Sequence, residues 1–471
     1  MSVNWSRRSN ENPSRKAPIS QLDTKTGRAL RRGAAAVILA LIPAMWWLTL
    51  APWDFCEFGF RRAVYNVVAT VIAIVVVYFL LSDKSTKEKG QLTALVFGSA
   101  LFCLTLLEAP VFLFGFNYQQ VFRMASNNTA LNLSEGVNKP DPILIHVHWP
   151  HSSFSGEVAG NLVQLGIPTK TRYRADVRYD RNGFRNSRDL ERADIVVIGD
   201  SFVEAATIRQ DRTLAALLES RLGAPTANLG QIAYGLRQEL EVLKRFALPL
   251  SPKLIVWVLF GGNDLRDVEY YERQLSRFGK PTPPIPLTER LFLRNALFAG
   301  RDLIDNTMRV SLQCPPKEKA LHRSGIFRRS DGVTEQVFFG QSTDPWTPHQ
   351  WEVAVDTLKE AKRLAAESGA EFVLVFVPRK YRVYRNHITV SPNHAISRWK
   401  LTSLPHELGE WSRQNGIAFI DTTPFLEAQI AKGVHPYFVD DVHWNELGHD
   451  TAARAVIDYL SAQRMFPFRS R

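Results

Sequence analysis

Cysteine is scarce in this sequence, which has three in 471 residues: Cys56, Cys103 and Cys314. Three cysteines cannot form the disulfide framework of a small secreted domain. Metal ligands are also sparse. His146, His148 and His151 lie close together, but no carboxylate or cysteine accompanies them at the spacing of a metal site. We therefore predict neither a metal site nor a cofactor.

Signatures of nucleic-acid binding are missing as well, although the net charge is +12. The chain has no helix-turn-helix, zinc or RNA-binding motif. Residues 1–32 hold half of the excess charge, with eight Lys/Arg against two acidic residues. A tail of this composition is typical of disordered chain. The sequence therefore predicts a basic tail over residues 1–32 and no nucleic-acid partner.

Charged residues are almost absent from three long runs in the first quarter of the chain: 33–52, 63–81 and 92–116. Only Glu108 and Pro110 interrupt the third run. A helix needs about 20 apolar residues to cross the roughly 30 Å hydrocarbon core of a bilayer. The first run is too long for a cleaved signal peptide, and two more runs follow it. We therefore predict three transmembrane helices within residues 33–116.

Basic residues predict the orientation of these helices. They are abundant before the first run and recur after the second, at Lys84, Lys87 and Lys89. The loop between the first two runs has only Arg61 and Arg62. This pattern predicts a multi-pass protein of the inner (plasma) membrane with a cytosolic amino terminus. Everything after about residue 117 would then be extracytoplasmic.

Strands and helices alternate beyond residue 190. Five short apolar runs read as strands: 195–198, 226–229, 253–260, 372–377 and 417–420. Helical segments follow them, which predicts an α/β fold with a parallel, doubly wound sheet. We assign 117–180 to a connecting region and 181–465 to the sheet domain. Its proline-rich insert at about 268–348 leaves the regular pattern, and we expect it to cover the active edge of the sheet.

Polar residues follow the ends of these strands. Ser201 follows the first strand, the turn from Gly230 to Gly235 follows the second, and Asn263 follows the third. His443 lies in a loop before the last helix. Because parallel strands end at one edge of a sheet, these residues should lie close together. The G-x-S-x-G elbow of α/β-hydrolases is absent.

This set contains the groups that serine acyl transfer requires. Ser201 is the candidate nucleophile, and His443 can take its proton. A carboxylate must orient the histidine, and we favour Asp440 over Asp441. The oxyanion needs preorganised donors, which the Ser201 N–H, a backbone N–H between Ala233 and Gly235, and the Asn263 amide can supply.

These motifs resemble the SGNH (GDSL-type) hydrolase family over about residues 180–465. Gly199-Asp200-Ser201-Phe202 looks like the first family block, Gly261-Gly262-Asn263-Asp264 like the third, and Asp440-x-x-His443 like the fifth. At the glycine of the second block this chain has Ala233, with Gly235 two residues later. The resemblance implies a flavodoxin-like parallel sheet and a catalytic set of Ser201, His443, Asp440 and Asn263.

Two further stretches resemble acetyltransferase members. Asp441-Val442-His443-Trp444 looks like the Asp-x-His-Trp arrangement of the alginate O-acetyltransferase branch, which keeps Asp441 open as the acid. Val377-Pro378-Arg379-Lys380 with Tyr384 is similar to a Pro-x-Lys…Tyr stretch of such members.

Three functions remain open at this point. The first is a membrane-tethered extracytoplasmic serine esterase that acts on an acylated carbohydrate or another ester. The second is an O-acyltransferase that acetylates an envelope or exported polysaccharide through the same acyl-enzyme. The third is a non-catalytic glycan-binding or scaffold protein.

Overall fold

The computed structural model describes residues 19–50, 60–119, 121–122, 134, 136–162, 171–278, 286–312, 323–340, 346–390 and 394–466. The chain divides into two compact units, Met1–Phe114 and Gly115–Arg471. Residues 1–18 of the basic tail, and residues 279–285, 313–322 and 341–345 of the insert, lie outside the described residues.

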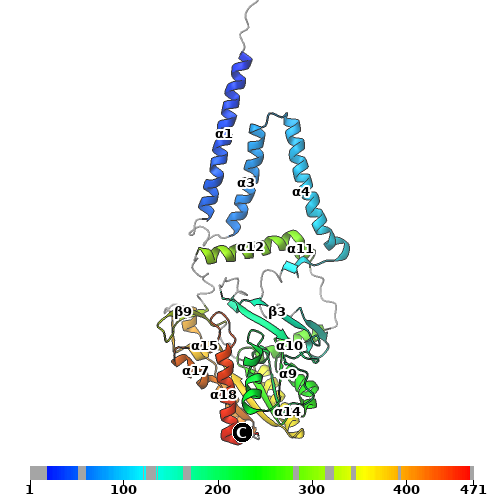
Figure 1. Ribbon diagram of the computed structural model, residues 1–471, viewed down its shortest axis with the longest axis vertical. Coiled ribbons are helices and arrows are strands. Elements are labelled where there is room, and N and C mark those ends of the chain that lie inside the picture. Colours follow the sequence, from blue (N-terminus) through cyan, green and yellow to red (C-terminus); the bar gives the residue numbers. More distant parts are fainter. Residues whose placement is uncertain are drawn as a thin grey trace, which may run out of the picture. The chain divides into compact units, whose positions relative to one another are not determined.

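Three long helices make up the first unit (Figure 1): α1 (Ile19–Leu50), α3 (Phe60–Leu81) and α4 (Thr86–Phe114). Each is long and apolar enough to cross a membrane. A hydrogen bond from Trp46 Nε1 to Thr70 Oγ1, 3.0 Å long, joins α1 to α3.

The expectation of disorder in the tail is wrong for its second part, because α1 already begins at Ile19. No proline follows Pro18 before Pro43, so nothing stops the helix from extending back from its apolar part. Helix propagation is cooperative, which makes such an extension favourable once the apolar turns have formed.

A five-stranded parallel sheet forms the centre of the second unit, with the strand order β12-β10-β7-β5-β6. This is the flavodoxin-like order, and it confirms the fold class predicted from the sequence. The strands begin and end within one or two residues of the predicted bounds: β5 (Ile195–Gly199), β6 (Thr226–Gly230), β7 (Leu254–Phe260), β10 (Glu371–Val377) and β12 (Ala418–Asp421).

The sheet is covered by helices on both faces (Figure 1). Successive strand residues point to opposite faces, so Val197 joins one buried cluster and Val196 the other. The first cluster includes α8 (Leu214–Leu222), α17 (Thr423–Ala431) and α18 (Glu446–Gln463). The second includes α9 (Leu236–Val242), α14 (Pro348–Glu367) and α16 (Leu404–Gln414). Of these six helices, α17 alone was not expected from the sequence.

The insert contains more regular structure than its prolines suggest. It holds α10 (Asp264–Arg277), α11 (Leu287–Arg290), α12 (Phe292–Ser311), β8 (Ser324–Arg328) and β9 (Thr334–Phe338). Strands β8 and β9 form an antiparallel hairpin that β11 (Ile388–Thr389) extends. Asp331-Gly332 turns this hairpin, with φ +85° at the glycine.

The connecting region also contributes strands. They form two antiparallel pairs: β1 (Asn138–Asp141) with β2 (Ile145–His148), and β3 (Ser153–Val158) with β4 (Tyr173–Arg178). Asn161 follows β3, and its backbone and side chain reach the loop that carries His443.

Candidate active site

Ser201 stands where β5 turns into the four-residue helix α7 (Ser201–Glu204). Asp200 caps this turn, because its Oδ1 accepts the N–H of Phe202 at 2.9 Å. The turn packs directly on the end of β6. A Cβ at Gly230 would lie 2.3 Å from the backbone nitrogen of Glu204, so only glycine fits there.

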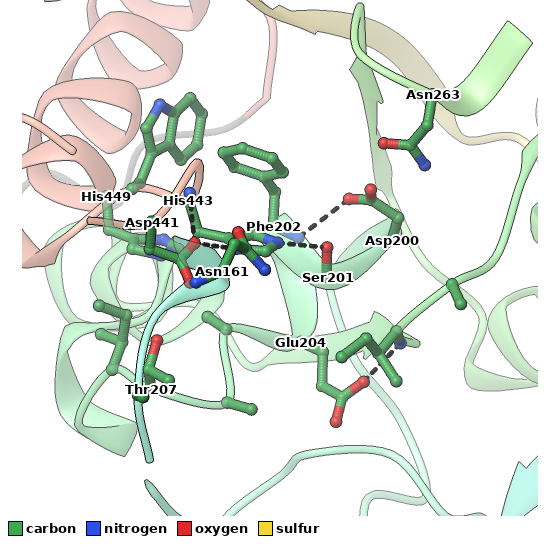
Figure 2. A pocket seen from close by; sticks show the side chains of 17 residues that line it. Asn161, Asp200, Ser201, Phe202, Glu204, Thr207, Asn263, Asp441, His443 and His449 are labelled. Carbon is green, nitrogen blue, oxygen red and sulfur yellow. Dashed lines mark hydrogen bonds and ion pairs between the residues drawn. The ribbon is translucent and has the colours of Figure 1, made fainter. Parts of the chain in front are cut away.

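His443 lies between Ser201 and a carboxylate (Figure 2). Its Nε2 is 2.8 Å from Ser201 Oγ, and its Nδ1 is 2.6 Å from Asp441 Oδ1. A hydroxyl, an imidazole and a carboxylate joined in this order make up a serine triad. The structure thus brings Ser201 and His443 together although 242 residues separate them.

The preference for Asp440 as the partner of His443 is wrong in this structure. Asp441 Oδ1 accepts the backbone N–H of His443 at 2.9 Å, which is an Asx turn that sets the carboxylate beside the ring. Asn161 N–H donates to Asp441 Oδ2 at 2.9 Å and holds the other oxygen. The Asp440 side chain instead accepts a hydrogen bond from the Tyr173 hydroxyl.

The electrostatics of the pair favour a charged carboxylate beside the imidazole. Burial by itself would lower the pKa of His443, but the negative charge and hydrogen bond of Asp441 outweigh it and raise that pKa above the ordinary value. Burial would raise the pKa of Asp441, and His443 again outweighs it, so that pKa is lowered. His443 is thereby a stronger base than a free imidazole.

A cavity of about 390 Å³ opens beside the serine. Among its lining residues are Ser201, Ala233, Asn263, Asp441 and His443 (Figure 2). The strand-end residues predicted to share one sheet edge therefore do so. The volume is in the range of small-molecule sites.

The turn after β6 contains both candidates for the backbone oxyanion donor, Ala233 and Gly235, and their surroundings differ. Ala233 lines the cavity and has φ +63°, a conformation that is uncommon for alanine. Gly235 is the N-cap of α9, and its N–H donates to Gln238 Oε1 at 3.2 Å. The N–H of Gly235 is therefore already used, and of the two candidates Ala233 is the one that lines the cavity.

Asn263 is the N-cap of α10, and two glycines separate it from the end of β7. Its Nδ2 donates to Asp267 Oδ2 on the next turn of α10. Burial raises the pKa of the neighbouring Asp200 to about 6. The hydrogen bonds from the Phe202 N–H and the Asn263 side chain lower this pKa, but by less than burial raises it. Asp267 thus accepts one N–H of the Asn263 side-chain amide, and Asn263 lines the cavity.

A buried carboxylate, Glu204, holds the Ala233 turn, and the sequence did not single it out. Glu204 Oε2 accepts the Ile232 N–H at 2.5 Å, and Oε1 accepts the Tyr179 hydroxyl at 2.6 Å. His148 Nε2 lies 3.5 Å from Glu204 Oε1, and His146 Nε2 lies 3.2 Å from the Ile232 carbonyl. Two of the three clustered histidines therefore support this turn.

Lys380 belongs to the Pro-x-Lys…Tyr stretch noted in the sequence, and the structure shows what this lysine contacts. It is buried, and its Nζ donates to the carbonyls of Phe438, Val439 and Asp441, the last two at 3.0 Å. Burial lowers its pKa to about 7, although Asp441 and Asp440 act against the shift. Lys380 thus fixes the backbone on which Asp441 stands.

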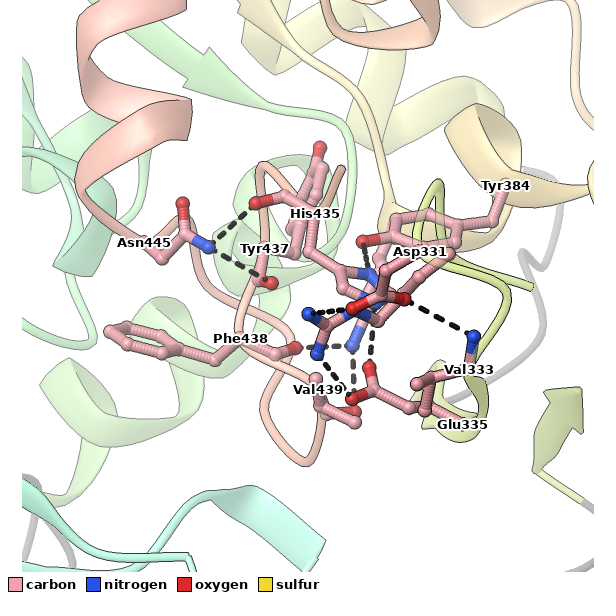
Figure 3. Close-up of polar contacts among 11 residues, drawn as sticks. Asp331, Val333, Glu335, Tyr384, His435, Tyr437, Phe438, Val439 and Asn445 are labelled. Carbon is pink, nitrogen blue, oxygen red and sulfur yellow. Dashed lines mark hydrogen bonds and ion pairs between the residues drawn. The ribbon is translucent and has the colours of Figure 1, made fainter. Parts of the chain in front are cut away.

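His435 anchors the start of the same loop to the β8–β9 hairpin (Figure 3). Its Nε2 is 2.9 Å from Glu335 Oε2, and its Nδ1 is 2.8 Å from the Tyr384 hydroxyl. Asn445 Nδ2 donates to the His435 carbonyl at 2.7 Å and closes the loop from its other end. The insert therefore supports the loop of His443 through Glu335.

Residues 341–469 match the model of the family described as "SGNH hydrolase-like domain, acetyltransferase AlgX". This match confirms the resemblance to SGNH hydrolases and to their acetyltransferase branch. The enzyme class predicted from the motifs, an SGNH-type esterase or a related O-acyltransferase, agrees with it. The matched segment contains Asp441 and His443 but begins after Ser201, Ala233 and Asn263.

Solved structures align with the chain at low similarity. An acetylxylan esterase from Geobacillus stearothermophilus is 12% identical, with 60% of this chain and 99% of that chain covered and a TM-score of 0.31. A GDSL-like lipase from Bacteroides thetaiotaomicron is 13% identical, with 57% and 88% covered and a TM-score of 0.28. No curated protein matches the chain.

Proposed function

We propose that this protein is a membrane-tethered extracytoplasmic serine esterase in which Ser201 is the nucleophile, His443 the general base and Asp441 the residue that orients His443. The observation that carries the proposal is the line of contacts from Ser201 Oγ to His443 Nε2, 2.8 Å, and from His443 Nδ1 to Asp441 Oδ1, 2.6 Å. The line ends in a cavity large enough for an acyl group and part of a sugar.

In this mechanism His443 takes the proton of Ser201 while Oγ attacks the ester carbonyl. Asp441 stabilises the imidazolium that forms. The N–H groups of Ser201 and Ala233 and the side-chain amide of Asn263 stabilise the oxyanion. His443 then protonates the leaving alcohol, which departs and leaves the acyl group on Ser201. Water, deprotonated by His443, releases the acid and restores the serine.

A second candidate is O-acyl transfer, in which a sugar hydroxyl rather than water attacks the acyl-enzyme. The observation in its favour is the match of residues 341–469 to an acetyltransferase family model. The same groups serve both reactions, because only the acceptor differs. The acceptor in this case would be an envelope or exported polysaccharide.

The proposed location rests on the basic residues around the candidate spans. Arg28, Arg31 and Arg32 lie in the first two turns of the first candidate span, Thr26–Leu48. Lys84 lies between the second and third spans, and Lys87 and Lys89 lie in the first turn of the third, Thr86–Phe114. Such residues favour the cytosolic side. Three crossings then place Gly115–Arg471 outside the cytoplasm. A reporter fused to the carboxyl terminus should be active only in the extracytoplasmic compartment, and a cytosolic signal would contradict this orientation.

The proposed activity is tested by the Ser201→Ala variant of the full chain with a chromogenic acetyl ester. We expect a loss of at least about 10³-fold in kcat, because the nucleophile is gone. Ser461→Ala, on the exposed side of α18, is the matched control and should keep the full rate. A Ser201→Ala enzyme as active as wild type would exclude the serine mechanism. If wild type itself shows neither hydrolysis nor transfer to polysaccharide acceptors, the non-catalytic function is favoured.

A further inference from the structure

Helix α12 in the insert exposes an apolar stripe. Leu293, Leu297 and Ile304 are spaced by four and seven residues and therefore share one face of the helix. Their exposed fractions are 43%, 51% and 44%. A neighbouring leucine, Leu303, is 68% exposed. A helix of a soluble domain would turn such a stripe toward its core.

The polar side of α12 shows the opposite behaviour. Asn295 is only 6% exposed. Its Nδ2 donates to the carbonyls of Glu289 and Leu291, at 2.9 and 2.7 Å, in the segment that leads into α12. The helix thus directs a polar residue toward its own chain and its leucines outward. Outward-facing leucines of this kind are more stable against an apolar surface than in water.

Arginines border the exposed stripe. The guanidinium groups of Arg294 and Arg301 lie 5.0 and 4.9 Å from the ring centroid of Phe298, which is itself 43% exposed. Helices that lie in a membrane surface combine leucine and phenylalanine with basic residues at the edge of the apolar face. Long basic side chains can then reach lipid phosphates while their stems stay in the apolar layer.

The chain itself ties the start of α12 to the end of the third candidate span. The ring of Phe292 packs on Tyr118 and Phe122, with centroids 5.2 and 5.6 Å apart. Tyr118 is the fourth residue after Phe114, where α4 ends. Four residues reach at most about 14 Å. If α4 crosses a bilayer, Phe292 is held within reach of its surface, among aromatic residues of the kind that gather there.

We propose that α12 lies in the surface of the membrane that the three candidate spans cross, with Leu293, Leu297 and Ile304 in the acyl boundary and Arg294 and Arg301 at the lipid phosphates. The proposal rests on the proposed membrane attachment, but not on the activity. We expect lipid to cover the apolar stripe. A second copy of the chain or a soluble protein on the same stripe is an alternative outcome of the test.

The test uses the full chain with Cys56, Cys103 and Cys314 changed to serine, and one cysteine introduced for an environment-sensitive NBD label. Leu297→Cys reports on the stripe. Phe97→Cys, exposed in the middle of α4, reports on insertion of the span, and Glu367→Cys, at the exposed end of α14, reports on water. Each protein is reconstituted into vesicles of phosphatidylcholine and phosphatidylglycerol, with quenchers either on lipid acyl chains or dissolved as iodide.

We expect lipid-borne quenchers to dim the label at position 297 at least about twofold more than the label at position 367, and iodide to do the reverse. Ile304→Cys should repeat this result. A label at 297 that behaves like the one at 367 would overturn the proposal. So would a label shielded from both quenchers, which is the result for a protein partner or a second copy. Loss of lipid quenching at position 97 would instead show that the membrane attachment itself is wrong.

Discussion

The nucleophile and the base of the candidate triad are held in two different ways. Ser201 stands at the end of the central strand β5, and its turn is fixed by the Asp200 cap and by close packing on Gly230. His443 stands on a loop outside the sheet. Asn161, Lys380 and Asn445 hold that loop, and the first two are more than 60 residues away in sequence.

The difference means that distant substitutions act mainly on the base. A strand end in a buried sheet has few alternative conformations, since its backbone hydrogen bonds and both packing faces are satisfied. A loop keeps its conformation only as long as the side chains that cross to it remain. Changes at the loop supports should therefore lower the rate of the chemical step while the serine end of the site remains intact.

The largest effect is expected from Asp441→Asn. Loss of the charge beside His443 removes the stabilisation of the imidazolium, and we expect kcat to fall by roughly 10⁴-fold. Asp440→Asn is the matched control, because its amide oxygen can still accept the Tyr173 hydroxyl, and its activity should fall less than about tenfold. Equal losses in both variants, measured with a chromogenic ester, would contradict the assignment of Asp441.

Asn263→Ala tests the serine side of the comparison. Removal of one oxyanion donor should lower kcat by about 10²–10³-fold and leave KM nearly unchanged. Asp267→Asn keeps the Asn263 side chain and changes only one of its partners, so its effect should be about tenfold or less. If Asn263→Ala changed KM and left kcat as in wild type, the amide would bind the ground state rather than the oxyanion.

Lys380→Met tests the loop supports directly. Three carbonyls lose their buried donor, the Asp441 backbone shifts, and we expect kcat to fall by about 10–100-fold at constant KM. Tyr384→Phe removes only the hydroxyl that contacts His435, and a smaller loss is expected. Thermal unfolding checks that both variants are folded. A folded Lys380→Met enzyme with the rate of wild type would argue against the role of this lysine.

The smallest effect is a displaced pH profile. His443 must be neutral to act as a base, so kcat/KM should fall as the pH drops through its pKa. Because Asp441 and Asp200 raise that pKa against the effect of burial, the midpoint should lie above the ordinary histidine value of 6.5. In Asp441→Asn the residual activity should have a lower midpoint, whereas Asp440→Asn should not move it. A midpoint below 6.5 in wild type would contradict this electrostatic picture.

Much of the fold could be predicted because its signals are local. Runs such as Leu254–Phe260 are apolar at every position, which is typical of a strand buried on both faces, and β7 occupies that run. Glycine-rich ends mark the turns that follow. Helices α10 and α12 were missed because the prolines between and after them predict irregular chain, although both helices carry apolar residues at helical spacing. Helix α17 was missed because its apolar residues do not follow a helical period.

Within the site, too, local motifs could be predicted from the sequence and contacts between distant residues could not. Ser201, Asn263 and His443 could be predicted from the sequence, since each follows a motif at the carboxyl end of a strand or precedes a helix. The choice between Asp440 and Asp441 could not. The two are adjacent and of one type, and only the Asx turn at His443 and the contacts of Asn161 and Tyr173 separate them.

The sequence by itself therefore determined the three apolar spans, the parallel sheet and the edge at which Ser201, Asn263 and His443 meet, because hydrophobic pattern and strand direction dictate these features. The tertiary structure alone decided which aspartate faces His443, which turn residue faces the cavity and which side chains hold the loop. These outcomes depend on contacts between distant parts of the chain, such as the hydrogen bond between Asn161 and Asp441, which are 280 residues apart. No local sequence pattern encodes the free energy of such a contact.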